Sequence, residues 1–203
     1  MHKYYILYNL FLIISIQPQL IAEIHANTFK YSIVQADHNS PINEITSMVN
    51  TAYARTLFLK LDAQRTNELE ISAIARMQNK KLFLCLDDKS SVCGTALLDL
   101  SSSSPEMSML AVHPKYQKQN IGKLLMQYVE QELVKLGYDH VLIYIVPFSQ
   151  AQLVAYYQKN GYRFLDTTLP FTHLQLAKAE YQDQLFFKIM RKDLVTASPL
   201  SCF

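Results

Sequence analysis

Apolar positions along the chain follow two spacings, one typical of β-strands and one typical of α-helices. Alternating or continuous apolar runs predict strands at 29–35, 81–86, 92–100, 107–112, 140–146, 162–165 and 185–190. Apolar residues three and four positions apart predict helices at 42–53, from about 66 to 77, from 121 to Gly137, and from about 150 to Gly161.

The order of these elements predicts an α/β (α+β) fold with a mixed sheet. A strand at 107–112, a long helix and a nearly all-apolar strand at 140–146 form a βαβ unit, which places the two strands parallel. The turn-rich stretch 87–91 joins two strands as a hairpin, which makes them antiparallel. Helices are therefore expected on both faces of the sheet.

Composition narrows the function classes. The chain has 203 residues, half of them hydrophobic, and its 19 basic and 17 acidic residues leave a formal charge of +2. Such a small charge argues against a nucleic-acid-binding protein. The six histidines show no metal-ligand spacing and no CxxC is present, so no metal site is expected. An odd count of three cysteines favours reduced thiols over a disulfide framework.

The two ends of the chain stand apart from this pattern. Residues 1–26 carry a short apolar run after Lys3, so they are either a signal or anchor segment or an upstream extension. Their cleavage signal is poor, because Ile24 or Leu20 stands where a small residue is required. The folded domain is expected at 27–195, followed by a tail at 196–203. Only residues 1–26 suggest contact with a membrane.

The clearest candidate for binding chemistry is the start of the helix after the strand 107–112. Free backbone amides and the positive end of the helix dipole meet there, which is how proteins hold a phosphate group. Lys118 and Lys123 add positive charge, and Gly122 permits close approach of a ligand. The alternative is an ordinary helix cap with no ligand. The residues at this helix start are Gln117, Lys118, Gln119, Asn120, Ile121, Gly122 and Lys123.

Two motifs connect this site to a known family. Residues 117–122 (QKQNIG) match an Arg/Gln-x-x-Gly-x-Gly/Ala signature except at Asn120, a residue type that tolerates the left-handed conformation better than most. Residues 156–162 (YYQKNGY) match an aromatic-Tyr-x-x-x-Gly-aromatic signature. Around these motifs, residues 107–165 resemble the core of the GNAT superfamily of N-acetyltransferases. The resemblance implies a mostly antiparallel sheet of six to seven strands, with acetyl-CoA bound at the central βαβ unit.

The resemblance also implies roles for particular residues. Glu106 stands where the family often keeps the carboxylate that removes the proton of the attacking amine. Tyr157 matches the tyrosine that protonates the leaving thiolate, whereas its neighbour Tyr156 is expected in the core. The backbone amides of Leu110, Ala111 and Val112 are expected to bind the thioester oxygen and the pantetheine arm. Gln150 takes a position that is often Asn in the family and is expected to contact the cofactor.

The acceptor amine is not identified by these motifs. The family resemblance assigns its pocket to residues 56–66 and 166–184, whose charged side chains either bind the acceptor or lie in solvated loops. The predicted activity is transfer of an acetyl group to a primary amine of a small molecule or peptide, in the cytoplasm, by a monomer or homodimer. The alternatives are a CoA-binding module without turnover and an exported or membrane-anchored protein.

Overall fold

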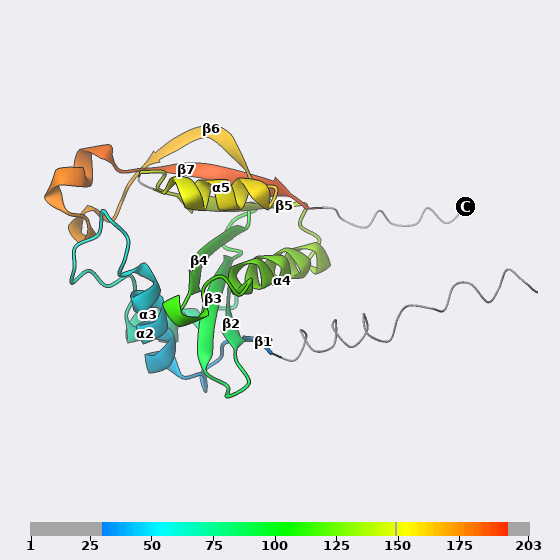
Figure 1. Cartoon of the computed structure of the whole chain (residues 1–203). Coiled ribbons are helices and arrows are strands. Elements are labelled where there is room, and N and C mark those ends of the chain that lie inside the picture. The colour runs from blue at the N-terminus through cyan, green and yellow to red at the C-terminus, as the bar shows by residue number, and fades with distance from the viewer. Residues whose placement is uncertain (1–29, 149, 195–203) are drawn as a thin grey trace, which may run out of the picture.

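The computed structural model describes residues 30–148 and 150–194. In this part of the chain, seven strands form one sheet in the order β1-β2-β3-β4-β5-β7-β6 (Figure 1). The strands are β1 (Ser32–Gln35), β2 (Lys80–Leu86), β3 (Val92–Asp99), β4 (Glu106–Val112), β5 (His140–Ile145), β6 (Arg163–Pro170) and β7 (Phe186–Asp193). Neighbouring strands are antiparallel except β4 and β5, which are parallel as the βαβ pattern predicted. The predicted mixed, mostly antiparallel sheet is confirmed.

Helices cover both faces of the sheet. They are α2 (Ile42–Tyr53), α3 (Glu68–Ile74), α4 (Ile121–Lys135) and α5 (Ala151–Lys159), with short 3-10 helices at Pro114–Tyr116, Leu174–Leu176 and Ala179–Gln184. Helices α4 and α5 pack on one face, where Leu125, Val129 and Leu133 are fully buried. Helices α2 and α3 pack on the other, where Ile45 and Ile71 are fully buried. Burying each such side chain contributes about 1.5–3 kcal/mol, so the sheet is held from both sides.

A third, smaller apolar cluster joins two distant loops. Phe58, from the connection between α2 and α3, stacks edge-on against Phe171, from the connection between β6 and β7, at 5.8 Å. Between these loops Leu59 and Ala177 form a β-bridge, and the Lys60 amide donates to the Leu176 carbonyl at 2.9 Å. The two segments that the resemblance assigned to the acceptor pocket therefore form one unit at the same end of the sheet (Figure 1).

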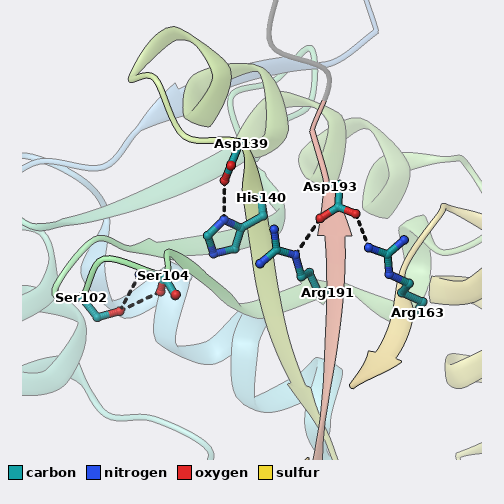
Figure 2. Close-up of polar contacts among 7 residues, drawn as sticks. All are labelled: Ser102, Ser104, Asp139, His140, Arg163, Arg191 and Asp193. Carbon is teal, nitrogen blue, oxygen red and sulfur yellow. Dashed lines mark hydrogen bonds and ion pairs between the residues drawn. The ribbon is translucent and has the colours of Figure 1, made fainter. Parts of the chain in front are cut away.

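The N-terminal end of β5 carries a group of charged side chains. Figure 2 shows Asp193 of β7 between two arginines, Arg191 of its own strand and Arg163 of β6. Asp139 lies beside His140, with 2.6 Å between the carboxylate Oδ1 and the imidazole Nδ1. These exposed pairs add little stability because water screens them. Of these pairs, only that of Arg163 with Asp193 joins two strands, β6 and β7.

The terminal segments lie outside the described residues, whereas two of the three cysteines lie within them. The segment 1–26, residues 27–29, residue 195 and the tail 196–203 lie outside the described residues. Within 30–148 and 150–194, no helix has both the length and the apolar character needed to cross a bilayer. Cys85 and Cys93 are both buried, free thiols on neighbouring strands.

Candidate active site

Strands β4 and β5 pair only at their beginning and then diverge. The parallel register contains one pair, Glu106 with Leu142, and the Leu142 amide donates to the Pro105 carbonyl at 2.9 Å. On its other side β5 pairs with β7 along its whole length, so β5 keeps its course while β4 moves away from it. Among residues 30–148 and 150–194, no strand therefore pairs with this edge of β4 beyond Glu106. An extended ligand can pair with such a free edge.

A β-bulge shapes β4 at this point. Thr95 lies opposite Ala111 and Leu97 opposite Ser108, so β4 uses one residue more than β3 over the same distance. Met109 has φ of +48°, which is strained for a residue with a side chain. Its carbonyl accepts a 3.0 Å hydrogen bond from the hydroxyl of the fully buried Thr95.

The bulge changes which side chains of β4 face each layer. Met107 packs with α4, whereas Met109 and Ala111 pack with α2 on the opposite face. In a regular strand all three would share one face. Leu110 and Val112 consequently pack toward α4. The amides of residues 110–112, expected to bind the cofactor, belong to this irregular stretch beside the diverging edge.

The start of α4 has the geometry of an anion-binding loop. Asn120 is the N-cap in the left-handed conformation, with φ of +63°, so this position has the backbone for which the family signature uses glycine. Lys118 also has φ of +63°. The first helical bond runs from the Leu124 amide to the Asn120 carbonyl, which leaves the amides of residues 121–123 without an acceptor inside the helix.

Two glutamines hold this loop in place through their side chains. The Gln117 amide donates to the Val112 carbonyl at 3.2 Å, which ties the loop to the end of β4. The Gln119 side-chain oxygen accepts from Lys30 Nζ at 2.9 Å and from the Tyr31 hydroxyl at 2.5 Å. Because their side chains are engaged in this way, Gln117 and Gln119 position the loop, and a ligand there would meet backbone amides and the exposed Lys118 and Lys123.

The two adjacent tyrosines of α5 face different surroundings. Tyr157 is 7% exposed and stacks edge-on against Tyr162 at 5.6 Å. Burial raises the pKa of Tyr157 well above its ordinary value, so the phenol stays protonated. Gln150, seven residues earlier at the N-cap of α5, lies on the same helical face as Tyr157.

The position of Tyr156 agrees only in part with the expectation that it lies in the core. Its ring is only partly buried, and its hydroxyl lies 3.2 Å from the position that a Cβ atom would take at Gly122. The ring packs against the core, as expected, but its hydroxyl reaches the start of α4. Helical spacing predicted that Tyr156 and Tyr157 point differently, but the approach to Gly122 depends on how α5 packs against α4 and leaves no local signal.

Glu106 lies on the α2 side of the sheet, opposite another carboxylate. It pairs across the strands with Asp99, which in turn forms a 2.7 Å ion pair with Lys80. Burial, followed by the charge of Asp99, raises the pKa of Glu106, while Lys80 and Arg65 act in the opposite direction. A carboxylate with a raised pKa is better matched to proton transfer near neutral pH than an ordinary one.

Further polar groups lie on the same side as Glu106. Tyr144 lies on the same face of β5 as Leu142. Burial, and to a lesser extent the negative charge of Glu106, raises the pKa of Tyr144. Tyr53, at the end of α2, packs against the apolar cluster on this face, and the Arg65 guanidinium lies over its ring. The described residues contain no group of three or more His, Cys, Asp or Glu side chains arranged to hold a metal ion.

A free strand edge, a β-bulge and a helix start with open amides thus lie together, an arrangement that can hold an extended ligand ending in an anionic group. The chain belongs to the GNAT acetyltransferase family, because residues 60–181 match the family model described as "Acetyltransferase (GNAT) domain". No curated protein sequence matches the chain significantly.

Solved structures of low sequence identity share the fold. The ribosomal-protein-S18-alanine N-acetyltransferase from Escherichia coli aligns with a TM-score of 0.63 and 17% identity, covering 85% of this chain and 99% of its own. A putative acetyltransferase from Acinetobacter baylyi gives 0.64 and 16%, covering 82% and 94%. An aminoglycoside 6'-N-acetyltransferase complexed with coenzyme A gives 0.62 and 14%, covering 83% and 99%. At these identities the likeness concerns the fold.

Proposed function

We propose that this protein transfers an acetyl group from acetyl-CoA to a primary amine of a small molecule or peptide, by direct attack of the amine on the thioester. The observation that carries this proposal is the divergence of β4 from β5 directly beside the open start of α4. A free strand edge beside a helix N-terminus suits a carrier that has both an extended amide arm and a diphosphate. The edge can pair with the arm, and the helix amides can bind the diphosphate.

The cofactor would be held mainly by backbone groups. The amides at the start of α4, from Gln119 to Lys123, would bind the diphosphate, with the side chains of Lys118 and Lys123 adding positive charge. The free edge at residues 110–112 would pair with the pantetheine arm and present an amide to the thioester oxygen. Gln150 and Tyr156 would add polar contacts from α5. Tyr156 enters this set because its hydroxyl lies beside Gly122.

Glu106 would act as the base. An alkylamine is protonated near neutral pH and must lose a proton before its nitrogen can attack. Glu106 takes that proton, directly or through a water molecule, on the α2 side of the sheet. The nitrogen lone pair then forms the C–N bond, and the carbonyl oxygen becomes an oxyanion that a backbone amide of β4 stabilises. Collapse of this intermediate breaks the C–S bond.

Tyr157 would act as the acid. Its hydroxyl donates a proton to the leaving thiolate of coenzyme A, and the phenol is restored by a proton from solvent. Burial raises the pKa of Tyr157 and so keeps the phenol in the protonated form that a proton donor requires.

Thiol release measured with acetyl-CoA and a panel of amines, peptides and aminoglycosides tests this function. Release that depends on an added amine supports it. Binding of acetyl-CoA with no release from any amine would replace it with a CoA-binding module.

We place the acetyltransferase domain at residues 27–195 and the activity in the cytoplasm, where acetyl-CoA is supplied. Cell fractionation with sequencing of the mature N-terminus, and light scattering for a monomer or homodimer, test these points.

A further inference from the structure

We infer that Arg65 binds an anionic group of the acceptor, a carboxylate or a phosphate, so that the preferred substrates are amines carrying such a group. This inference rests on the proposed function, which it extends to a substrate class. Its basis is the position of the Arg65 guanidinium on the acceptor side of β4, together with the lack of a carboxylate partner for it among the described residues.

The position of Arg65 is fixed by its neighbour Thr66. The side chain of Asn50, in α2, donates to the Thr66 carbonyl at 2.9 Å and accepts from the Thr66 amide at 3.1 Å. The Thr66 hydroxyl donates to Glu70 at 2.8 Å, and Thr66 is only 3% exposed. Because the amide and the carbonyl of Thr66 are both hydrogen-bonded, the backbone of the preceding residue, Arg65, is also held in position. Arg65 therefore begins from a rigid backbone.

From this backbone the guanidinium lies over the ring of Tyr53, 5.7 Å from the ring centroid. Tyr53 packs against the apolar cluster that contains Met109 and Ala111 of β4, so Arg65 lies on the same face of the sheet as Glu106. The charge of Arg65 is close enough to oppose the rise in the Glu106 pKa. The base that would accept the amine proton and a cation that can bind an anion thus share one side of the site.

Arg65 also differs from the other cations of the two acceptor segments. Lys60 donates to the Gln175 carbonyl and Lys178 to the Leu57 carbonyl, each at 2.8 Å, so both hold the loops together. Among residues 30–148 and 150–194, Arg65 forms no ion pair and is only partly buried. Its planar fork of donors, already oriented by Tyr53, suits a carboxylate or phosphate in a two-bond contact.

Matched acceptors test the inference. The carboxylate arm compares β-alanine and γ-aminobutyrate with their primary amides, and the phosphate arm compares phosphoethanolamine with ethanolamine. The kcat/KM values are taken at the pH-independent limit, where every amine is neutral. The wild-type protein should prefer the anionic member of at least one arm by about tenfold or more, as expected for a charge-assisted hydrogen bond. The arm that shows the preference identifies the anion.

Variants separate binding from structure. Arg65→Gln should bring the ratio of anionic to neutral acceptor close to one, through KM, while the neutral acceptor and acetyl-CoA affinity change little. Arg65→Lys should keep part of the preference. Arg76→Gln removes the same charge from an exposed position just after the end of α3 and should leave the ratio unchanged.

The results that overturn the inference are distinct from failure of the proposed function. Equal rates for anionic and neutral amines in the wild type, or the same preference in Arg65→Gln, would exclude this role for Arg65 alone. An equal loss with both members of a pair would show that Arg65 only supports the fold. Absence of thiol release with every amine would overturn the proposed function, and the substrate class with it.

Discussion

Glu106 and Asp99 lie directly opposite each other on neighbouring antiparallel strands, two carboxylates on one face of the sheet. Like charges in such a pair are unfavourable, and burial adds to the effect. Lys80 compensates Asp99 through a 2.7 Å ion pair, which leaves Glu106 as the carboxylate with the raised pKa. The strand register therefore provides Glu106 with the property that a base needs.

The first prediction concerns the pH dependence of kcat/KM. Activity should fall at low pH as Glu106 becomes protonated. Asp99→Asn removes the opposing negative charge and lowers the pKa of Glu106, so the acidic limb should move to lower pH. Glu106→Gln should leave activity that recovers only at higher pH. Asp88→Asn, in the exposed hairpin turn, is the control. An acidic limb that stays in place in Asp99→Asn would exclude Glu106 as its source.

The second prediction separates chemistry from binding at Tyr157. Tyr157→Phe removes the proton donor but keeps the ring and its stacking against Tyr162. Turnover should fall by about a hundredfold or more, as for loss of a general acid, while the dissociation constant for coenzyme A stays unchanged. Stopped-flow thiol release and calorimetry measure the two quantities. A turnover close to wild type would remove Tyr157 from the mechanism.

Much of this site could be predicted from local sequence. The βαβ pattern places Glu106 at the beginning of β4 and α4 between β4 and β5. The preference of Asn for positive φ explains Asn120. The face of Met109 does not follow from the alternation of apolar residues, because the bulge reverses that alternation. The place of Arg65 could not be predicted either, since it depends on the contact between Asn50 and Thr66.

The third prediction uses the contact between Gly122 and Tyr156. A Cβ at position 122 would lie 3.2 Å from the Tyr156 hydroxyl, closer than side chains normally pack. Gly122→Ala should raise the intrinsic helix stability by up to about 1 kcal/mol, yet weaken coenzyme A binding because Tyr156 is displaced. Thermal unfolding and calorimetry measure the two effects.

Tyr156→Phe provides the matched control for this contact. The double variant Gly122→Ala/Tyr156→Phe removes the hydroxyl that the new methyl group would meet. It should bind coenzyme A no more weakly than Tyr156→Phe alone. If Gly122→Ala weakens binding equally with and without the hydroxyl, the methyl group obstructs the ligand itself and Tyr156 has no part in the effect.

The last prediction concerns the bulge of β4. Thr95→Val keeps the shape of the side chain but removes the hydroxyl that donates to the Met109 carbonyl. Thr95 is fully buried, so the free energy of unfolding should fall by about 1–3 kcal/mol, the cost of a buried acceptor left without its partner. The strained Met109 conformation would then be less firmly held, and turnover should fall more than coenzyme A affinity. Thr95→Ser, which keeps the hydroxyl, should retain turnover despite losing a methyl group. Equal turnover in the Val and Ser variants would show that the bulge does not need this hydrogen bond to position its amides.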